Sequence, residues 1–598
     1  MIYLCDIERK KRVNKRLYKD SPISVTTNNI KKILQDNNIY VKEELLEGFK
    51  GVFSVNLSID ELGMCVNGKG TTAEIAIASA YGELIERIQN FALYKFTYPA
   101  VLESRSTGFM YAADEVSMPL VQQKNDILGP AISAKTQKIN KLLSDYEQSS
   151  GKVLCLPYTN YYENETVYLS ARFVEHIYAS NGMAAGNTSY EALVQSICEI
   201  FERFSNMCIC VGDMVPPDIP IESIKFSKEI AEVIFELRKN NDYDIYFKDC
   251  SLGLGLPVVG MFLVNRNSGK YFVKFGAHPI LEVAAERTIT ELYQGRKHIL
   301  SNFWMRNFTF DEIQDTQKNF KKIFRSGDGA YTYKLFSGDR TYDLSESWIN
   351  TDEIENIDNM FLFEYLMKII QKNEWDFLYR DVSFLGFPTV HSIIPQISYV
   401  TIIDDEYISR NIEFKKVLSS LSALRSCSKS ELLQIIEFID NNGYSSYDSL
   451  SPLIEIPSVY NDVLANTNNL YFKFLIYATI NENEKALENL DEYIATNNLQ
   501  NAQQATFFRC LREAFSAIKI KGLSIKTTID IMNNVFSEGL VEETVNIIKS
   551  NSYFAEFNEC KLDSCISCSC FNECKYQKIM EFHKKISKKY SEWMVVNG

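Results

Sequence analysis

The chain has 598 residues, a formal net charge of −14 and a pI of about 5.2. This acidic balance argues against broad nucleic-acid binding, which depends on basic patches. No stretch approaches 18 uncharged apolar residues, so we expect no membrane span. The first residues also lack the apolar core of a signal peptide. The length predicts roughly two to four domains.

Cysteine usage points to a reducing compartment. Of the 14 Cys, nine are scattered singly or in one close pair, and the other five lie between residues 560 and 574. Scattered thiols of this kind are typical of reduced cytosolic proteins. We therefore expect a cytoplasmic protein, with the Cys-rich segment treated separately below.

The N-terminal part predicts an arm, a helix and a strand. The basic run from Lys10 to Lys19 is mixed with Asn, Leu and Tyr, and we interpret it as a solvated arm. Ile30, Ile33 and Leu34 recur at helical spacing. Residues 51–57 alternate as a strand does.

A first polar helix is expected from about Thr72 to Phe91. The residues before it, Gly68-Lys69-Gly70, are interpreted as a glycine-containing loop. On the helix, Ser79, Glu83 and Glu86 share one face, and Arg87 follows directly. The other face is apolar.

A second polar helix is expected from Tyr190 to Asn206, after the loop at residues 180–188. Two glycines and two alanines in this loop would let backbone approach a ligand closely. Asn187 or Thr188 is a plausible N-cap. One stripe of the helix is polar, within roughly 80° of the wheel, and Arg203 follows it; the stripe contains Glu191, Gln195, Glu199 and Glu202.

The repeated Glu-x-x-Glu-Arg pattern favours one shared site. Taken alone, the second helix could equally be an amphipathic helix with an exposed acidic face. Carboxylates that meet from two helices repel each other unless a cation lies between them. Oxygen ligands of this kind suit Mg²⁺ bound with phosphates, and arginine forks suit the phosphate oxygens.

A hairpin and a third helix follow. Residues 256–264 form an apolar run, and with residues 272–276 they predict two paired strands. The helix expected from Leu281 to Leu300 places Glu282, Glu286 and Thr290 on one side, and we interpret Glu282 as part of an intrahelical salt-bridge network. We interpret His278, just before Pro279, as structural. A further strand is expected at residues 390–399.

With these motifs in this order, the chain resembles the YcaO family of ATP-dependent enzymes that modify peptide backbone amides. The resemblance spans roughly residues 15 to 400. The motifs that carry it are N-G-K-G at 67–70, S-x-x-x-E-x-x-E-R at 79–87, S-N-G-M-A-A-G-N-T at 180–188, E-x-x-x-Q-x-x-x-E-x-x-E-R at 191–203, F-G-A-H-P at 275–279 and E-x-x-x-E-R-x-x-x-E-x-x-Q-G-R at 282–296.

The resemblance implies an α+β fold, an ATP-binding core of β-sheets flanked by helices, and ATP held with Mg²⁺ without a P-loop. The chain indeed has no G-x-x-x-x-G-K-[ST]. It also implies the chemistry: a nucleophile attacks an amide carbonyl, the resulting oxyanion attacks the γ-phosphate, and phosphate then leaves. Such a reaction needs charge neutralisation more than a dedicated nucleophile.

The resemblance also assigns site residues. Glu83, Glu86, Glu199 and Glu202 would hold Mg²⁺, and Glu83, Glu199 and Arg203 would be catalytic. Capping is an equal alternative for Thr26. The expected nucleotide-binding set is Lys19, Thr26, Lys69, Ser79, Glu83, Glu86, Arg87, Asn187, Glu191, Gln195, Glu199, Glu202, Arg203 and Arg287.

We expect a YcaO-like domain at residues 1–405, a helical domain at 406–550 and a Cys-rich tail at 551–598. Helical segments alternate with polar turns in the second domain, as stacked helix pairs do, so a tetratricopeptide-like repeat is suspected without a strict 34-residue signature. Such an extension resembles the ribosomal-protein methylthiotransferase accessory branch. We expect this domain to contact a partner protein.

The tail predicts a metal site. Four thiols follow the pattern C-x₂-C-x-C-x₃-C, which can surround one zinc ion; they are Cys565, Cys568, Cys570 and Cys574. Cys560 or His583 could replace one of them. An iron–sulfur cluster and free redox-active thiols are the alternatives.

The end of the chain departs from azoline-forming members of the family, many of which end in Pro-x-Pro-x-Pro, because residues 593–598 contain no proline. We therefore expect an accessory factor for β-methylthiolation of a ribosomal protein, acting on a peptide or protein substrate and forming a homodimer. The alternatives are a thioamide- or azoline-forming enzyme and a non-catalytic ATP-binding adaptor.

Overall fold

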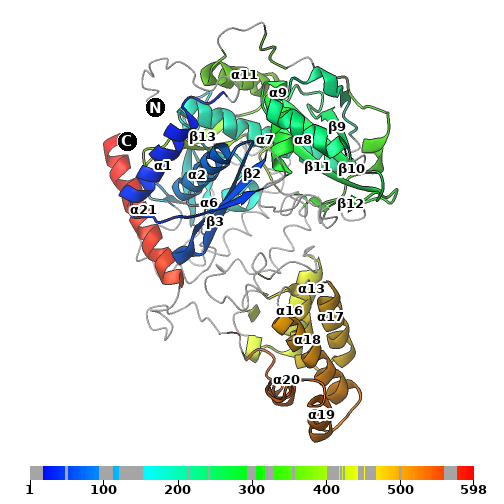
Figure 1. Cartoon of the computed structure of the whole chain (residues 1–598). Helices are drawn as coiled ribbons and strands as arrows, with labels where there is room; N and C mark the ends of the chain where they lie inside the picture. Colours follow the sequence, from blue (N-terminus) through cyan, green and yellow to red (C-terminus); the bar gives the residue numbers. More distant parts are fainter. Residues whose placement is uncertain are drawn as a thin grey trace. The chain divides into compact units, whose positions relative to one another are not determined.

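A computed structural model shows a chain that divides into two units (Figure 1). It describes residues 18–47, 52–92, 112–119, 152–211, 214–239, 243–292, 450 and 575–597, together with 305–400, 417–441 and 467–557 apart from short internal gaps. Unit 1 comprises Met1–Tyr94, Arg105–Ile403 and Lys578–Gly598, and unit 2 comprises Lys95–Ser104 and Asp404–Gln577. Unit 1 combines antiparallel sheets with helices, as the sequence predicts.

The first layer of unit 1 is a three-stranded sheet with one helix packed on it and a second helix packed on the first. The strands pair antiparallel in the order β1 (Lys42–Glu47), β2 (Phe53–Ile59) and β3 (Met64–Gly70). Helix α2 (Ala73–Gln89) contacts β2, β3 and α1 (Ile23–Asp36). The Thr72 hydroxyl caps α2 by accepting a hydrogen bond from the Ile75 N–H at 3.3 Å. This sheet therefore supports one face of α2.

The expected loop at Gly68-Lys69-Gly70 is wrong, because these residues end strand β3. A Cβ on Gly68 would lie 2.2 Å from the Ala76 carbonyl oxygen, and one on Gly70 would lie 2.5 Å from Ile75 Cγ2. The two glycines thus let α2 lie close against β3. Their role is to let the helix pack closely on the strand. The sequence does not reveal this role, because a glycine-rich loop and a glycine-rich strand have similar patterns.

A second sheet lies beside α9 and α8. The predicted hairpin is confirmed as β10 (Val258–Asn265) and β11 (Lys270–Ala277), and α9 (Leu281–Glu291) packs on both strands. Helix α8 (Lys228–Lys239) packs on β9. The sheet order is β12-β11-β10-β9-β8, with β12 at Arg306–Asn307, β9 at Tyr243–Asp249 and β8 at Asp218–Ile219.

The third sheet carries the loop that opens the second polar helix. Its order is β4-β5-β13-β14-β7, with β6 paired to β5. Its strands are β4 (Val116–Pro119), β5 (Lys152–Asn160), β6 (Thr166–Ser170), β7 (Met183–Ala185), β13 (Leu378–Asp381) and β14 (Thr389–Ile393).

Helix α7 (Ser189–Val211) is the central helix of unit 1. It contacts β7 and β14 of the third sheet, β10 and β11 of the second, and helix α11 (Asn359–Lys372). Ile197, Ile200 and Phe201 on α7 are fully buried. Packing on so many sides explains why α7 runs five residues beyond the expected end at Asn206.

Helix α21 (Lys575–Asn597) returns from unit 2 to unit 1 and lies beside α1 (Figure 1). Lys585 Nζ donates a hydrogen bond to the Asn37 carbonyl oxygen at the end of α1. Ile586 and Tyr590 are buried. The largely polar helix α21 therefore packs on unit 1 through a few buried side chains.

The described part of unit 2 is helical. Its apolar core includes the buried rings of Phe472, Phe474 and Phe515. Contacts join α16 to α17, α17 to α18 and α18 to α20. The helices are α13 (Lys429–Asn441), α16 (Asn469–Thr479), α17 (Asn483–Thr496), α18 (Ala502–Phe515), α19 (Ile525–Met532) and α20 (Glu538–Ser550).

Within the described ranges, no helix combines the length and apolar character needed to cross a membrane. The tetratricopeptide-like repeat stays a prediction. The candidate zinc ligands Cys565, Cys568, Cys570 and Cys574 lie outside the described residues. His583, the alternative ligand, is 1% exposed and its ring lies 5.3 Å from that of Phe91, which gives it a packing role in unit 1.

Candidate functional site

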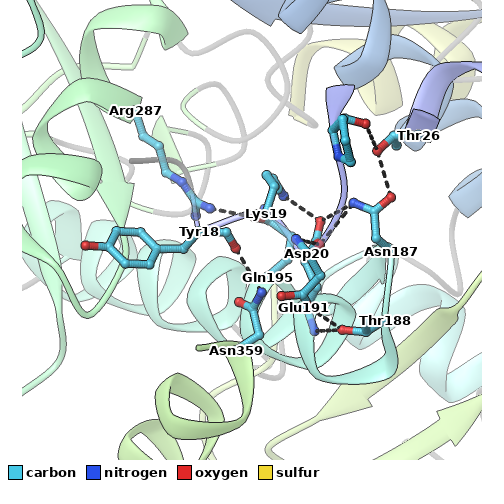
Figure 2. Close-up of polar contacts among 11 residues, drawn as sticks. Tyr18, Lys19, Asp20, Thr26, Asn187, Thr188, Glu191, Gln195, Arg287 and Asn359 are labelled. Atoms are coloured by element: carbon cyan, nitrogen blue, oxygen red, sulfur yellow. Dashed lines mark hydrogen bonds and ion pairs between the residues drawn. The ribbon is translucent and has the colours of Figure 1, made fainter. Parts of the chain in front are cut away.

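Glu191, in the first turn of α7, is the centre of one polar cluster (Figure 2). It is only 4% exposed. Its carboxylate accepts hydrogen bonds from Asn187 Nδ2 at 3.0 and 3.1 Å and from the Asp20 N–H at 2.9 Å. Lys19 Nζ lies 3.1 Å from Glu191 Oε1. Three of these groups were predicted from the sequence, and the structure brings them into contact.

Two threonines complete this cluster. Thr188 caps α7, because its hydroxyl accepts from the Glu191 N–H at 3.1 Å, and it donates to the Asp20 carboxylate. Thr26 donates to Asn187 Oδ1 at 2.7 Å. Thr26 lies inside α1, whose N-cap is Pro22. The capping alternative for Thr26 is therefore wrong, and its hydroxyl belongs to the cluster.

Arg287 joins α9 to α7. Its Nη2 donates to Gln195 Oε1 at 2.7 Å, and its Nη1 donates to the Ala277 carbonyl oxygen at 2.6 Å. His278 beside them is buried, and desolvation holds its pKa well below the usual value, so the ring is neutral. Its Nδ1 accepts from the Ile280 N–H at 3.1 Å. This agrees with a structural role for His278.

The carboxylates of α2 and α7 form a second cluster with their own arginines. Arg87 lies 3.6 Å from the carboxylates of both Glu83 and Glu86, and Arg203 lies 2.5 Å from that of Glu199. These side chains are between 14% and 27% exposed. The alternative of an ordinary exposed acidic face is therefore wrong.

The two helices influence each other's charges. Burial raises the pKa of Glu83, and the Glu199 carboxylate on α7 raises it further, while Arg87 and Lys69 lower it. Burial likewise raises the pKa of Glu86, and Glu199 and Arg203 of α7 are among its electrostatic neighbours. The repeated motif therefore does bring its carboxylates into one region, as the sequence predicts.

Lys69 of β3 lies in the same region. It forms an ion pair with Glu291, the last residue of α9. Burial lowers the pKa of Lys69 to about 8, although Glu202 and Glu83 nearby favour its charged form. Burial also raises the pKa of Glu202. The region thus contains several partly desolvated carboxylates together with Lys69, Arg87 and Arg203.

This chemistry fits a bound Mg²⁺–nucleotide complex. Oxygen donors with raised pKa values gain stability when a cation replaces a proton. In the structure Glu83 and Glu199 pair with Arg87 and Arg203, and the carboxylates do not converge on a common point where a cation could bind. Among the described residues, no three His, Cys, Asp or Glu side chains are grouped closely enough to hold a metal ion. Binding would require these side chains to leave their arginines.

The glycines of the loop before α7 contact the protein's own backbone. A Cβ on Gly182, which has φ +82°, would lie 2.1 Å from the Ser392 carbonyl oxygen. A Cβ on Gly186 would lie 2.5 Å from the Ala192 nitrogen. From the sequence, these glycines were expected to let backbone approach a ligand closely. In the structure they allow β14 and the first turn of α7 to lie close to the loop.

Several contacts were not predicted. Asn359 Nδ2 donates to the Tyr18 carbonyl oxygen at 2.8 Å and so holds the segment that carries Lys19. Nothing in the local pattern around Asn359 indicates this. Glu291 was visible at helical spacing from Arg287, but only the fold shows that it meets Lys69. Ser79 is exposed.

Comparison with known proteins relates the chain to a family. The family described as YcaO cyclodehydratase, ATP- and Mg²⁺-binding, matches residues 67–398, and a YcaO cyclodehydratase C-terminal domain matches residues 412–587. The chain is 29% identical over 452 residues to the ribosomal protein S12 methylthiotransferase accessory factor YcaO of Escherichia coli K12. That alignment covers 73% of this chain and 75% of the relative.

Two solved structures are also similar. YcaO from Methanopyrus kandleri, bound with AMPPCP and Mg²⁺, shares 16% identity at a TM-score of 0.40, covering 66% of this chain and 98% of that one. A heterocyclase in complex with substrate and cofactor shares 16% identity at a TM-score of 0.45, covering 65% and 54%. Because the YcaO family model matches more than half of this chain, the chain belongs to the YcaO family.

Proposed function

We propose that this protein binds ATP with Mg²⁺ between α2 and α7 and activates a backbone amide of a peptide or protein. The observation that carries the proposal is that Glu199 of α7 is close enough to Glu83 and Glu86 of α2 to raise the pKa of both. The family description names the same two ligands. A relative of similar length is named as an accessory factor of a methylthiotransferase.

The cluster around Glu191 would hold the nucleoside end of the ligand. Asn187 and Thr26 offer a buried amide and hydroxyl, and Lys19 supplies a cation 3.1 Å from Glu191. Each of these groups is already oriented by another member of the cluster. Little side-chain order would therefore be lost on binding, which favours affinity.

The carboxylate cluster would hold Mg²⁺ and the phosphates. Glu83, Glu86, Glu199 and Glu202 supply the oxygen donors that Mg²⁺ prefers. Arg87 and Arg203, now paired with these carboxylates, would then turn to phosphate oxygens, which their forked donors match. When bound, ATP would supply the phosphoryl group that activates the amide oxygen.

The residues of the chain would act in catalysis mainly through charge. Arg203 would stabilise negative charge that develops on the reacting groups, whereas Glu83 and Glu199 would act through the Mg²⁺ that they hold, and partial burial strengthens each interaction. One of the carboxylates would also pass the proton that the reaction requires. Positioning and electrostatics thus supply the chemistry together.

The test is calorimetric titration of the full chain with ATP in the presence and absence of Mg²⁺. Glu83→Gln and Glu202→Gln should each weaken Mg-ATP binding tenfold or more, about 1.4 kcal/mol. Glu74→Gln is the matched control, because Glu74 lies exposed on the same helix. Unchanged affinity in both site variants would remove the assignment.

We further propose that the protein serves as an accessory factor for methylthiolation of a ribosomal protein, with unit 2 contacting a partner protein. The relative's name supports the first part, and the helical build of unit 2 suits the second. Single-turnover ATP hydrolysis with and without peptides of ribosomal protein S12 separates an enzyme from an ATP-binding adaptor. Hydrolysis that no peptide accelerates would favour the adaptor.

A further inference from the structure

Two exposed tyrosines lie in the turn between β5 and β6. Tyr161 is 43% exposed and Tyr162 is 45% exposed, and their ring centroids are 5.5 Å apart. The turn is held in place, because the Asn160 side-chain oxygen accepts from the N–H groups of Tyr162 at 3.0 Å and of Glu163 at 3.3 Å. The Tyr161 N–H also donates to the Phe377 carbonyl oxygen at 2.9 Å. The backbone that carries the two rings is therefore fixed before any ligand binds.

A third tyrosine extends this surface to the first turn of α7. The rings of Tyr161 and Tyr190 both pack against Phe363 of α11, with centroid distances of 5.7 and 5.6 Å. Tyr190 is partly exposed and directly precedes Glu191, the centre of the first polar cluster. We call Tyr161, Tyr162 and Tyr190 the tyrosine face. It begins beside the cluster that we assign to the nucleoside.

The charges that border the tyrosine face are negative. Burial is the main cause of the raised pKa of Tyr162 and of Tyr190, and the carboxylates of Asp376 and Glu364 raise these pKa values further. Lys368, one turn beyond Glu364 on α11, is not among the charges that act on the two phenols. Tyrosine rings attract ammonium and guanidinium groups, and carboxylates accept hydrogen bonds from the same groups. This surface therefore suits a cationic ligand.

We propose that the tyrosine face, with Asp376 and Glu364, binds a segment of the substrate that is rich in Lys or Arg. The inference rests on the proposed function, because it assumes that the substrate is a peptide or protein. It goes further by naming the class of polypeptide. A ribosomal protein fits this class, since its contacts with the polyanionic ribosomal RNA depend on Lys and Arg.

The tyrosine face lies at a distance from the reacting groups that a peptide can span. Nine residues of α7 separate Tyr190 from Glu199, a rise of about 14 Å along the helix. An extended peptide covers this distance with about four residues. The basic segment would therefore bind apart from the amide that reacts, and the tyrosine face would contribute to substrate affinity without taking part in the chemistry.

The test measures the Kd of a fluorescent Arg-rich peptide for the full chain by fluorescence anisotropy, without nucleotide. Tyr162→Leu removes an exposed ring and should raise the Kd about twofold to fivefold. Glu364→Gln removes an exposed carboxylate and should raise it by a similar factor. A peptide with Glu in place of every Arg should bind far more weakly than the Arg-rich peptide. Equal affinity for the two peptides would overturn the proposal.

Two controls separate the tyrosine face from the general attraction between a basic peptide and an acidic protein. Glu222→Gln changes the net charge as Glu364→Gln does, at an exposed position elsewhere in unit 1. Tyr40→Leu removes another exposed tyrosine of unit 1. Both should leave the Kd unchanged. If Tyr162→Leu fails to fold, Glu364→Gln decides. No weakening in the site variants, or equal weakening in the controls, would overturn the proposal.

A kinetic measurement connects the tyrosine face to the substrate. In single-turnover ATP hydrolysis with peptides of ribosomal protein S12, Tyr162→Leu should raise the half-saturating peptide concentration about twofold to fivefold. The rate at saturation should stay unchanged, because the face binds the peptide away from the reacting atoms. A lower saturated rate with unchanged half-saturation would overturn this role.

The outcomes also separate this inference from the proposed function. If Glu83→Gln weakens Mg-ATP binding but neither Tyr162→Leu nor Glu364→Gln weakens peptide binding, only the inference about the tyrosine face is refuted. If the unaltered chain binds no Mg-ATP, the proposed function fails. The anisotropy measurement then still decides whether the tyrosine face binds basic peptides, since it contains no nucleotide.

Discussion

His391 in β14 links the pH dependence of stability to the loop that opens α7. Its Nδ1 is 2.9 Å from the Tyr158 hydroxyl, and its Nε2 is 3.2 Å from the Asn181 carbonyl oxygen. The ring is 2% exposed. Because a carbonyl only accepts, the proton is on Nε2 and Nδ1 accepts from Tyr158. Burial, with Arg380 nearby, lowers the pKa of His391 to about 3.

This shift makes the folded protein less stable as the pH falls. The unfolded chain takes up a proton near pH 6.5, whereas the folded chain keeps His391 neutral until about pH 3. The associated stability is fully present above pH 6.5 and is lost progressively below it. By linkage the loss from this one group reaches about 2 kcal/mol at pH 5.

Chemical unfolding of the unaltered chain and of His391→Gln at pH 7.5 and pH 5 tests this value. Glutamine can still donate to Asn181, so at pH 7.5 the variant should lose only about 1–3 kcal/mol. Between the two pH values its stability should fall by about 2 kcal/mol less than that of the unaltered chain. His278 and the buried carboxyls are common to both proteins and cancel. Equal pH dependence in the two proteins would refute the argument.

Three further predictions concern packing, a buried ion pair and the tail. Gly68→Ala should cost about 1–3 kcal/mol in urea unfolding because its Cβ meets helix α2. A Cβ at Gly82, on that helix, would have no atom within 4 Å, so Gly82→Ala should raise the free energy of unfolding by up to about 1 kcal/mol. Equal effects of the two substitutions on stability would contradict the packing model. Arg380→Met removes the cation from the largely buried Asp114 carboxylate, which keeps only its hydrogen bond from Tyr590, and should cost about 3–5 kcal/mol, more than Tyr590→Phe at about 1–3 kcal/mol, whereas the reverse order would contradict this account. Elemental analysis should find about one zinc per chain, lost in Cys568→Ser with Mg-ATP binding retained, and metal-free protein would exclude the site.

Much of the site was predictable because helical periodicity survives in the fold. Glu191, Gln195 and Glu199 share a stripe in the sequence, and they line one side of α7 in the structure. Local pattern was sufficient in these places because burial of an apolar stripe fixes which face of a helix turns inward.

The errors came from contacts between distant parts of the chain. Glycines at 68 and 70 look alike whether they serve a loop or a strand under a helix, and only the approach of Ala76 decides between the two. Helix α21 was not expected because its partners, Phe91 and Phe384, lie hundreds of residues earlier. A sequence pattern records which surface a helix can bury but not the element that covers it.

The same long-range contacts explain how α2 can hold its carboxylates in place. Gln89 at its end donates to the Phe387 carbonyl oxygen at 2.8 Å, and its own Oε1 accepts from the Leu385 N–H at 2.7 Å. Phe91, just beyond, packs against Tyr590 of α21. The start of α2 is fixed by the glycines of β3 and its end by β14 and α21. Because both ends are held, Glu83 and Glu86 keep their distance from α7, and a bound cation needs only side-chain rotations.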